Sequence, residues 1–175
     1  MELQNCLFYW LFVFFFVTIE KMKNECIFCK IINGEVPAHK IWEDKEHLAI
    51  LDIFPNTPGF TVVLTKEHKG SYFAAEEDTV VTDLVKAAKK VALLLDKAFK
   101  DVERTALMFE GYGVDHLHCK LFPMHGTKGA VSGGSVEVGQ GVFFEKYPGF
   151  ITSQNAKKAD YTELAELAKK IRNVI

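Results

Sequence analysis

The sequence predicts one α+β domain in which an antiparallel sheet packs against a long helix. Strand-like apolar runs lie close together early in the chain, the strongest helical pattern follows them, and two more strand-like runs come after that helix. The 175 residues suffice for a single domain. Since 49% of them are apolar and 25% are charged, the chain can build a hydrophobic core and a polar surface.

The first expected element is a short helix. Residues 26–37, which read CIFCKIINGEVP, carry an apolar stripe formed by Ile27, Ile31 and Ile32. An Asn-Gly pair then ends the stripe, as is typical of a helix closed by a glycine turn.

Three strands are expected next, over residues 40–43, 47–53 and 60–66. The last two are rich in β-branched and apolar residues, which favour a sheet covered on at least one face. The turn cluster FPNTPG separates them, so they are expected to pair as antiparallel neighbours.

The longest helix is expected over residues 78–100, where apolar side chains recur at helical spacing and lysines occupy the other face. Two strands follow, over residues 105–110 and 116–122. Residues 126–141 are rich in glycine and predict a loop, and residues 160–173 predict a closing amphipathic helix.

An unbroken apolar block, LFYWLFVFFFVTI, occupies residues 7–19. It is shorter than the ~20 residues that span a bilayer, and no basic segment precedes it as in a secretory signal. A membrane anchor, an extra buried element and a misassigned start upstream of Met22 all remain open. For residues 1–24 we favour an appendage or a misassigned start. We therefore expect a cytoplasmic protein without a membrane partner.

The formal net charge is −2, which argues against a protein that holds nucleic acid by neutralising its phosphates. A small nucleotide needs only one local pocket. Among the four cysteines, Cys26 and Cys29 form a C-x-x-C pair that suits a metal or redox site better than a secreted disulfide framework. Cys119 is expected to be an inert buried thiol.

The run VDHLHCKLF carries the candidate chemistry. Residues two apart on a strand point to the same face, so His116, His118 and Lys120 are expected to project together. Histidine suits nucleophilic attack on phosphorus, because its neutral ring carries a free lone pair near neutral pH. A neighbouring lysine offers positive charge to phosphate oxygens.

HLHCKLFP resembles the signature strand of the histidine triad (HIT) superfamily, His-φ-His-φ-His-φ-φ, where φ is apolar. The order of the preceding segments agrees: CIFCKIINGEVPAHKIWED, then HLAILDIFPNTPGFTVVLTKEH, then the long helix. The resemblance covers residues 25–126, as a nucleotide-binding domain. Residues 127–175 then form a C-terminal extension with the glycine-rich loop and the terminal helix.

The resemblance implies a homodimer that hydrolyses a nucleoside phosphate, such as a diadenosine polyphosphate or a nucleoside phosphoramidate. His118 would attack the α-phosphorus and form a nucleotidyl-histidine, with His116 at the first triad position. Asp52 would hold the ribose hydroxyls, since a carboxylate accepts two hydroxyl donors. Ile31 and Ile53 would flank the base, although both are equally well explained as core residues.

Two positions depart from the family pattern. Lys120 replaces the third histidine and is a poor proton shuttle if its pKa stays near ~10.4. Gly113 stands where typical hydrolases of the family carry a phosphate-binding serine, so only its backbone N–H could make this contact. The alternatives are therefore a nucleotidyltransferase with an acceptor other than water, or a nucleotide-binding sensor module without turnover.

Some members of the family add two histidines to the C-x-x-C pair and bind a structural zinc. The corresponding set here is Cys26, Cys29, His68 and His116, a standard tetrahedral donor set for zinc. Surface or capping positions are expected for the remaining histidines: His39, His47 and His125.

Overall fold

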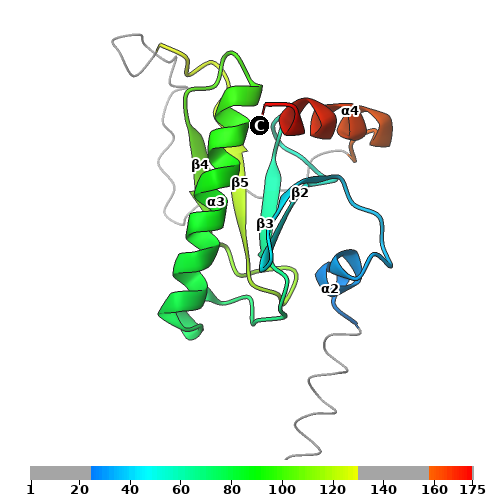
Figure 1. Cartoon of the computed structure of the whole chain (residues 1–175), viewed down its shortest axis with the longest axis vertical. Coiled ribbons are helices and arrows are strands. Elements are labelled where there is room, and N and C mark those ends of the chain that lie inside the picture. The colour runs from blue at the N-terminus through cyan, green and yellow to red at the C-terminus, as the bar shows by residue number, and fades with distance from the viewer. Residues whose placement is uncertain (1–24, 130–157, 175) are drawn as a thin grey trace, which may run out of the picture.

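The computed structural model describes residues 25–129 and 158–174. The apolar block of residues 7–19 and most of the glycine-rich loop lie outside the described residues. The described part is the predicted α+β domain, a five-stranded antiparallel sheet with helices on both faces (Figure 1). None of its helices is both long enough and apolar enough to cross a bilayer.

The sheet has the strand order β1-β2-β3-β5-β4, so the last strand in sequence lies between two earlier ones. Each predicted helix and strand is present, with bounds that differ by up to two residues from the expected ones. The described elements are α2 (Ile27–Ile32), β1 (Lys40–Glu43), β2 (His47–Leu51), β3 (Thr61–Thr65), a short 3₁₀ turn (Phe73–Ala75), α3 (Asp78–Ala98), β4 (Thr105–Met108), β5 (His118–Pro123) and α4 (Tyr161–Arg172).

Local hydrogen bonds explain two boundaries that the sequence placed wrongly. β2 ends at Leu51 because the Asp52 carboxylate accepts the N–H of Phe54 at 2.7 Å and turns the chain. β5 begins at His118, and His116 lies before it, where its N–H donates to the Val114 carbonyl at 2.9 Å.

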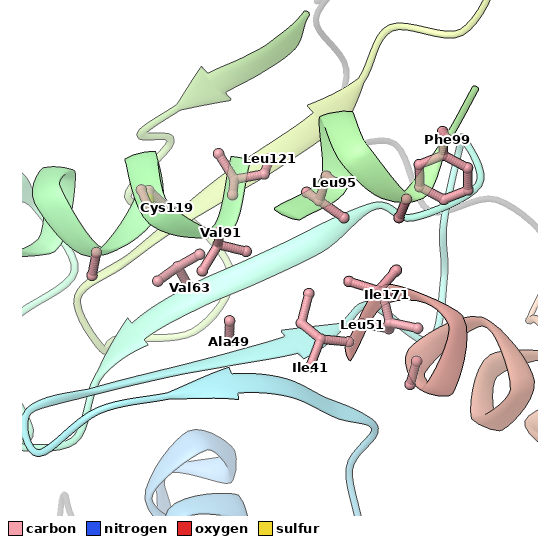
Figure 2. Close-up of a cluster of buried hydrophobic side chains, with 14 of the residues drawn as sticks. Ile41, Ala49, Leu51, Val63, Val91, Leu95, Phe99, Cys119, Leu121 and Ile171 are labelled. Atoms are coloured by element: carbon pink, nitrogen blue, oxygen red, sulfur yellow. The ribbon is translucent and has the colours of Figure 1, made fainter. Parts of the chain in front are cut away.

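The two faces of the sheet build two apolar clusters, and alternate residues of β2 divide between them. The larger cluster lies under α3 and α4 and includes Cys119 and Leu121 of β5 (Figure 2). The smaller cluster joins Ile31 of α2 to β2 and β3. α4 is part of the larger cluster through Leu164, Ala168 and Ile171, so it shares the core of the sheet.

Cys119 is fully buried, and burial raises the pKa of its thiol to about 12. This confirms the expectation of an inert core cysteine. The expected surface position of His47 is wrong: it is 5% exposed on β2, and its Nδ1 lies 3.1 Å from the Asp44 carboxylate.

Candidate functional site

The structure brings Cys26, Cys29, His68 and His116 together at one end of β3 and β5. One ligand atom from each residue lies within 4.8 Å of all the others. Cys26 Sγ is 3.4 Å from His116 Nδ1, and Cys29 Sγ is 3.3 Å from His68 Nδ1. The predicted metal-ligand set is therefore assembled in space, although its members span more than 90 positions of the chain.

Local structure turns the donor atoms toward one point. Cys26 precedes the first turn of α2 and Cys29 lies in that turn, so their three-residue spacing places both sulfurs on one side of the helix. His68 follows β3 and His116 precedes β5. Both cysteines are almost fully buried, at 8% and 9% exposed.

His116 is held in the form that binds a metal. Its Nε2 lies 2.7 Å from the Thr65 carbonyl oxygen and donates a hydrogen bond to it, which leaves the Nδ1 lone pair facing the sulfurs. Burial lowers the pKa of His116 to about 4, so the ring is neutral at neutral pH. Two thiols that can ionise and two imidazoles fit a tetrahedral zinc ion.

His118 is oriented by the backbone of the same segment. Its Nδ1 donates to the His116 carbonyl oxygen at 2.6 Å, which leaves Nε2 as the ring nitrogen with a lone pair. The side chain is buried, and burial lowers its pKa below the usual histidine value. His118 is therefore a neutral imidazole with a defined tautomer, as a nucleophile requires.

Phe28 links the two histidines and was not singled out in the sequence. Its ring meets those of His118 and His116 edge-on, with centroids 5.2 and 5.7 Å apart. Its position between the two cysteines of the C-x-x-C pair is the sequence signal that could have identified it.

Lys120 lies two residues beyond His118 and forms an ion pair with Glu110, which follows β4. The Lys120 side chain is 13% exposed and that of Glu110 is 32% exposed, so the pair is partly shielded from water. The sequence identified Lys120 but not its partner.

The expected nucleotide-binding residues occupy different surroundings. Asp52 is half-buried, and its negative charge acts on His118. Ile31 belongs to the cluster on the α2 face, whereas Ile53 packs against the cluster under α3. Gly113 has a φ of +90° and no neighbour within 4 Å of a hypothetical Cβ, which leaves its backbone accessible.

Together these features define a small α+β domain with a buried His-x-His segment beside a Cys₂His₂ cluster. The sequence model of the HIT domain matches residues 33–127, more than half of the chain. The chain therefore belongs to the HIT family, and the resemblance noted in the sequence is confirmed.

Curated relatives agree with this assignment. An uncharacterized HIT-like protein of Methanocaldococcus jannaschii is 36% identical over 109 residues, which cover 61% of this chain and 84% of the relative. The adenosine 5'-monophosphoramidase hnt1 of Schizosaccharomyces pombe is 30% identical over 123 residues, covering 70% of this chain and 85% of that enzyme.

Solved structures share the fold. A Hit-like protein from Bartonella henselae has a TM-score of 0.64 and 26% identity, covering 87% of this chain and 97% of that chain. A zinc-bound histidine triad family protein from Mycobacterium smegmatis has a TM-score of 0.56 at 20% identity, covering 87% of this chain and 94% of that chain. At that identity, the second similarity concerns the fold alone.

Proposed function

We propose that this chain is a nucleotide hydrolase that cleaves a P–N or P–O bond of a nucleoside phosphate through a covalent intermediate on His118. The observation that carries the proposal is the orientation of His118, whose Nδ1 donates to the His116 carbonyl at 2.6 Å. The Nε2 lone pair is then available to attack phosphorus.

The preferred substrate class is a nucleoside phosphoramidate, with dinucleoside polyphosphates second. The fission-yeast relative is an adenosine 5'-monophosphoramidase, which supports this order. In the first step a P–N bond to His118 forms while the P–N bond to the amine breaks, and the amine leaves after taking a proton from solvent. In the second step water attacks phosphorus, and His118 leaves as neutral imidazole.

Other residues have supporting roles in this proposal. Asp52 accepts the ribose hydroxyls, Gly113 offers its backbone N–H to a phosphate oxygen, and Lys120 balances phosphate charge. Ile31 lies on the α2 face of the sheet and is assigned to the base. Ile53 is explained as a core residue, because it packs under α3.

We further propose that Cys26, Cys29, His68 and His116 hold a structural zinc ion. The four donor atoms within 4.8 Å and the Thr65 carbonyl that orients His116 support this assignment. The ion would fix His116, whose own carbonyl oxygen orients His118. In this proposal the zinc ion has a structural role, and His118 has the catalytic role.

The test is to trap the intermediate. The protein is incubated with adenosine 5'-phosphoramidate carrying ³²P in its phosphate, then denatured, and an acid-labile, alkali-stable label is sought on the chain. His118→Asn should abolish both label and turnover while preserving the circular dichroism spectrum. His39→Asn, at a half-buried histidine that contacts the Tyr161 ring, is the matched control and should retain both. A labelled His118→Asn protein would contradict the proposal.

Lys120 in place of a third histidine makes a nucleotidyltransferase the second candidate. In that case the label would form on His118 but persist in water, and an added acceptor would release it. A sensor module would instead bind the nucleotide without label or turnover, and that result would exclude the enzyme.

A further inference from the structure

Glu110 holds a carboxylate against Lys120, and neither the sequence motif nor the family signature assigns a role to it. Strands β4 and β5 pair with Thr105 opposite Pro123 and Met108 opposite Lys120. Extending this register by two residues places Glu110 level with His118 on the same face of the sheet. The ladder itself ends at Met108, and the Glu110 carboxylate reaches back to Lys120.

The ion pair determines what each partner can do. A lysine ammonium has three donors and no acceptor, so Lys120 cannot accept a proton from water while it is charged. An ionised carboxylate only accepts, so Glu110 can take that proton. Since an ammonium carries three N–H donors, Lys120 can pair with Glu110 and also donate to phosphate oxygens.

The other carboxylate whose charge acts on His118 is Asp52. Asp52 accepts the Phe54 N–H at 2.7 Å in the turn after β2 and is assigned to the ribose. The charges of Lys120, Glu110 and Asp52 all act on His118. Glu110 is therefore the described carboxylate best placed to serve the water step.

We propose that Glu110, oriented by Lys120, is the general base that activates water for hydrolysis of nucleotidyl-His118. The inference rests on the proposed function and adds the residue that replaces a third histidine. Glu110 takes one proton from water, the resulting hydroxide forms a P–O bond, and the P–N bond to His118 breaks with its electron pair returning to Nε2. Glu110 later releases the proton to solvent, so atoms and charge balance.

The test separates the two chemical steps. In rapid-quench experiments with ³²P-labelled adenosine 5'-phosphoramidate, Glu110→Gln should form the His118 adduct at the wild-type rate. Release of that adduct by water should slow by about 100-fold or more, the usual contribution of a general base. Glu43→Gln is the matched control, because Glu43 is also an exposed glutamate paired with lysines but lies on β1. It should leave both steps unchanged.

Fluoride tests whether the variant site is intact. Fluoride attacks phosphorus without losing a proton, so it should release the adduct from Glu110→Gln and from wild type at equal rates. Lys120→Arg should preserve release by water within a few-fold, whereas Lys120→Met should slow it, as expected for a positioning residue.

Three outcomes would count against the inference. Release by water from Glu110→Gln at the wild-type rate would overturn it and leave the proposed function standing. Equal slowing of adduct formation and release, without rescue by fluoride, would make Glu110 merely structural and would also overturn it. A wild-type protein with neither adduct nor turnover would refute the proposed function and this inference with it.

Discussion

At the scale of single residues, two backbone carbonyls orient the rings of His116 and His118. The Thr65 carbonyl accepts from His116 Nε2 at 2.7 Å, and the His116 carbonyl accepts from His118 Nδ1 at 2.6 Å. Each bond leaves the opposite ring nitrogen with its lone pair, directed to the cysteine sulfurs in one case and available for attack in the other. Under the proposed function, one short segment would thus orient one ring for metal binding and the other for attack on phosphorus.

Gly59 gives a prediction at this scale. Its φ is +81°, and a Cβ placed there would lie 2.6 Å from Cε2 of the buried Phe99 ring. Gly59→Ala should therefore combine left-handed strain with overpacking and lower the free energy of unfolding by about 2–4 kcal/mol. Gly34 has a φ of +79° with nothing within 4 Å, so Gly34→Ala should cost only about 1–2 kcal/mol. Urea unfolding measures both, and equal losses would contradict the steric argument.

The exposed Asp101–His125 pair gives a pH prediction. The hydrogen bond from His125 is the main reason why the pKa of Asp101 lies below its ordinary value of 3.8. A carboxylate with a lowered folded-state pKa stabilises the protein above its unfolded-state value, and this contribution is lost as pH falls through the folded-state pKa.

Asp101→Asn should therefore cause a small decrease in Tm at pH 6, and the difference from wild type should shrink below about pH 3.8. Calorimetry between pH 3 and pH 6 measures it. In a His125→Gln background the same substitution should have a smaller effect. A difference that does not vary with pH would exclude this pair as its cause.

The sequence predicted some site residues better than others, for a physical reason. Spacing encodes the C-x-x-C pair and the same-face relation of His118 and Lys120, so both could be predicted. The Glu110–Lys120 pair depends on the register between β4 and β5, which sequence spacing does not specify. The burial of His47 likewise depends on how β2 is covered within the sheet.

At the scale of elements, α2 depends on its surroundings. Its six helical residues are far fewer than the 12–15 or so at which an isolated helix becomes even marginally stable in water. The apolar contact of Ile31 with β2 and β3 attaches α2 to the sheet. A metal ion bound by Cys26 and Cys29 together with His68 and His116 would attach it a second time. Metal binding is therefore expected to stabilise α2 against the sheet.

We predict that the purified protein binds about one zinc ion per chain, as measured by plasma mass spectrometry. Removing zinc with a chelator should lower the Tm, because a ligand at about 1,000 times its Kd adds about 4 kcal/mol of stability. Cys29→Ser should lose the ion and most of this dependence. Cys119→Ala is the control, since that thiol lies in the apolar cluster under α3 and is not one of the four candidate zinc ligands. Zinc retained by Cys29→Ser, or no effect of chelation, would argue against the site.

Element bounds were harder to predict than element types. Apolar periodicity fixed the presence of α3 and of each strand, because the pattern repeats over several residues. The end of β2 depends instead on the single Asp52–Phe54 hydrogen bond. α4 packs onto a core built by residues earlier in the chain. Its amphipathic pattern predicts that one face is buried but does not specify the surface against which it packs.

At the scale of the whole molecule, the two edges of the sheet differ. At the β1 edge, α4 packs against β1 and its Arg172 donates to the Lys40 carbonyl. The β4 edge pairs only with β5 among the described strands, and Leu107 there is 42% exposed. Among the described residues no strand pairs with the outer edge of β4, and such an edge is a template for pairing with another chain.

This asymmetry makes the homodimer implied by the family resemblance a testable prediction. Two chains joined through their β4 edges would continue the sheet and cover Leu107 with its symmetry mate. Sedimentation equilibrium should then give about twice the 19.8 kDa mass of the chain. Leu107→Lys should shift the protein to the monomer, because two lysines would face each other across the axis. Leu93→Lys, at an apolar residue of α3 that is 53% exposed, is the matched control and should stay dimeric. A wild-type monomer would refute the dimer, and a dimer that persists in Leu107→Lys would place the interface elsewhere.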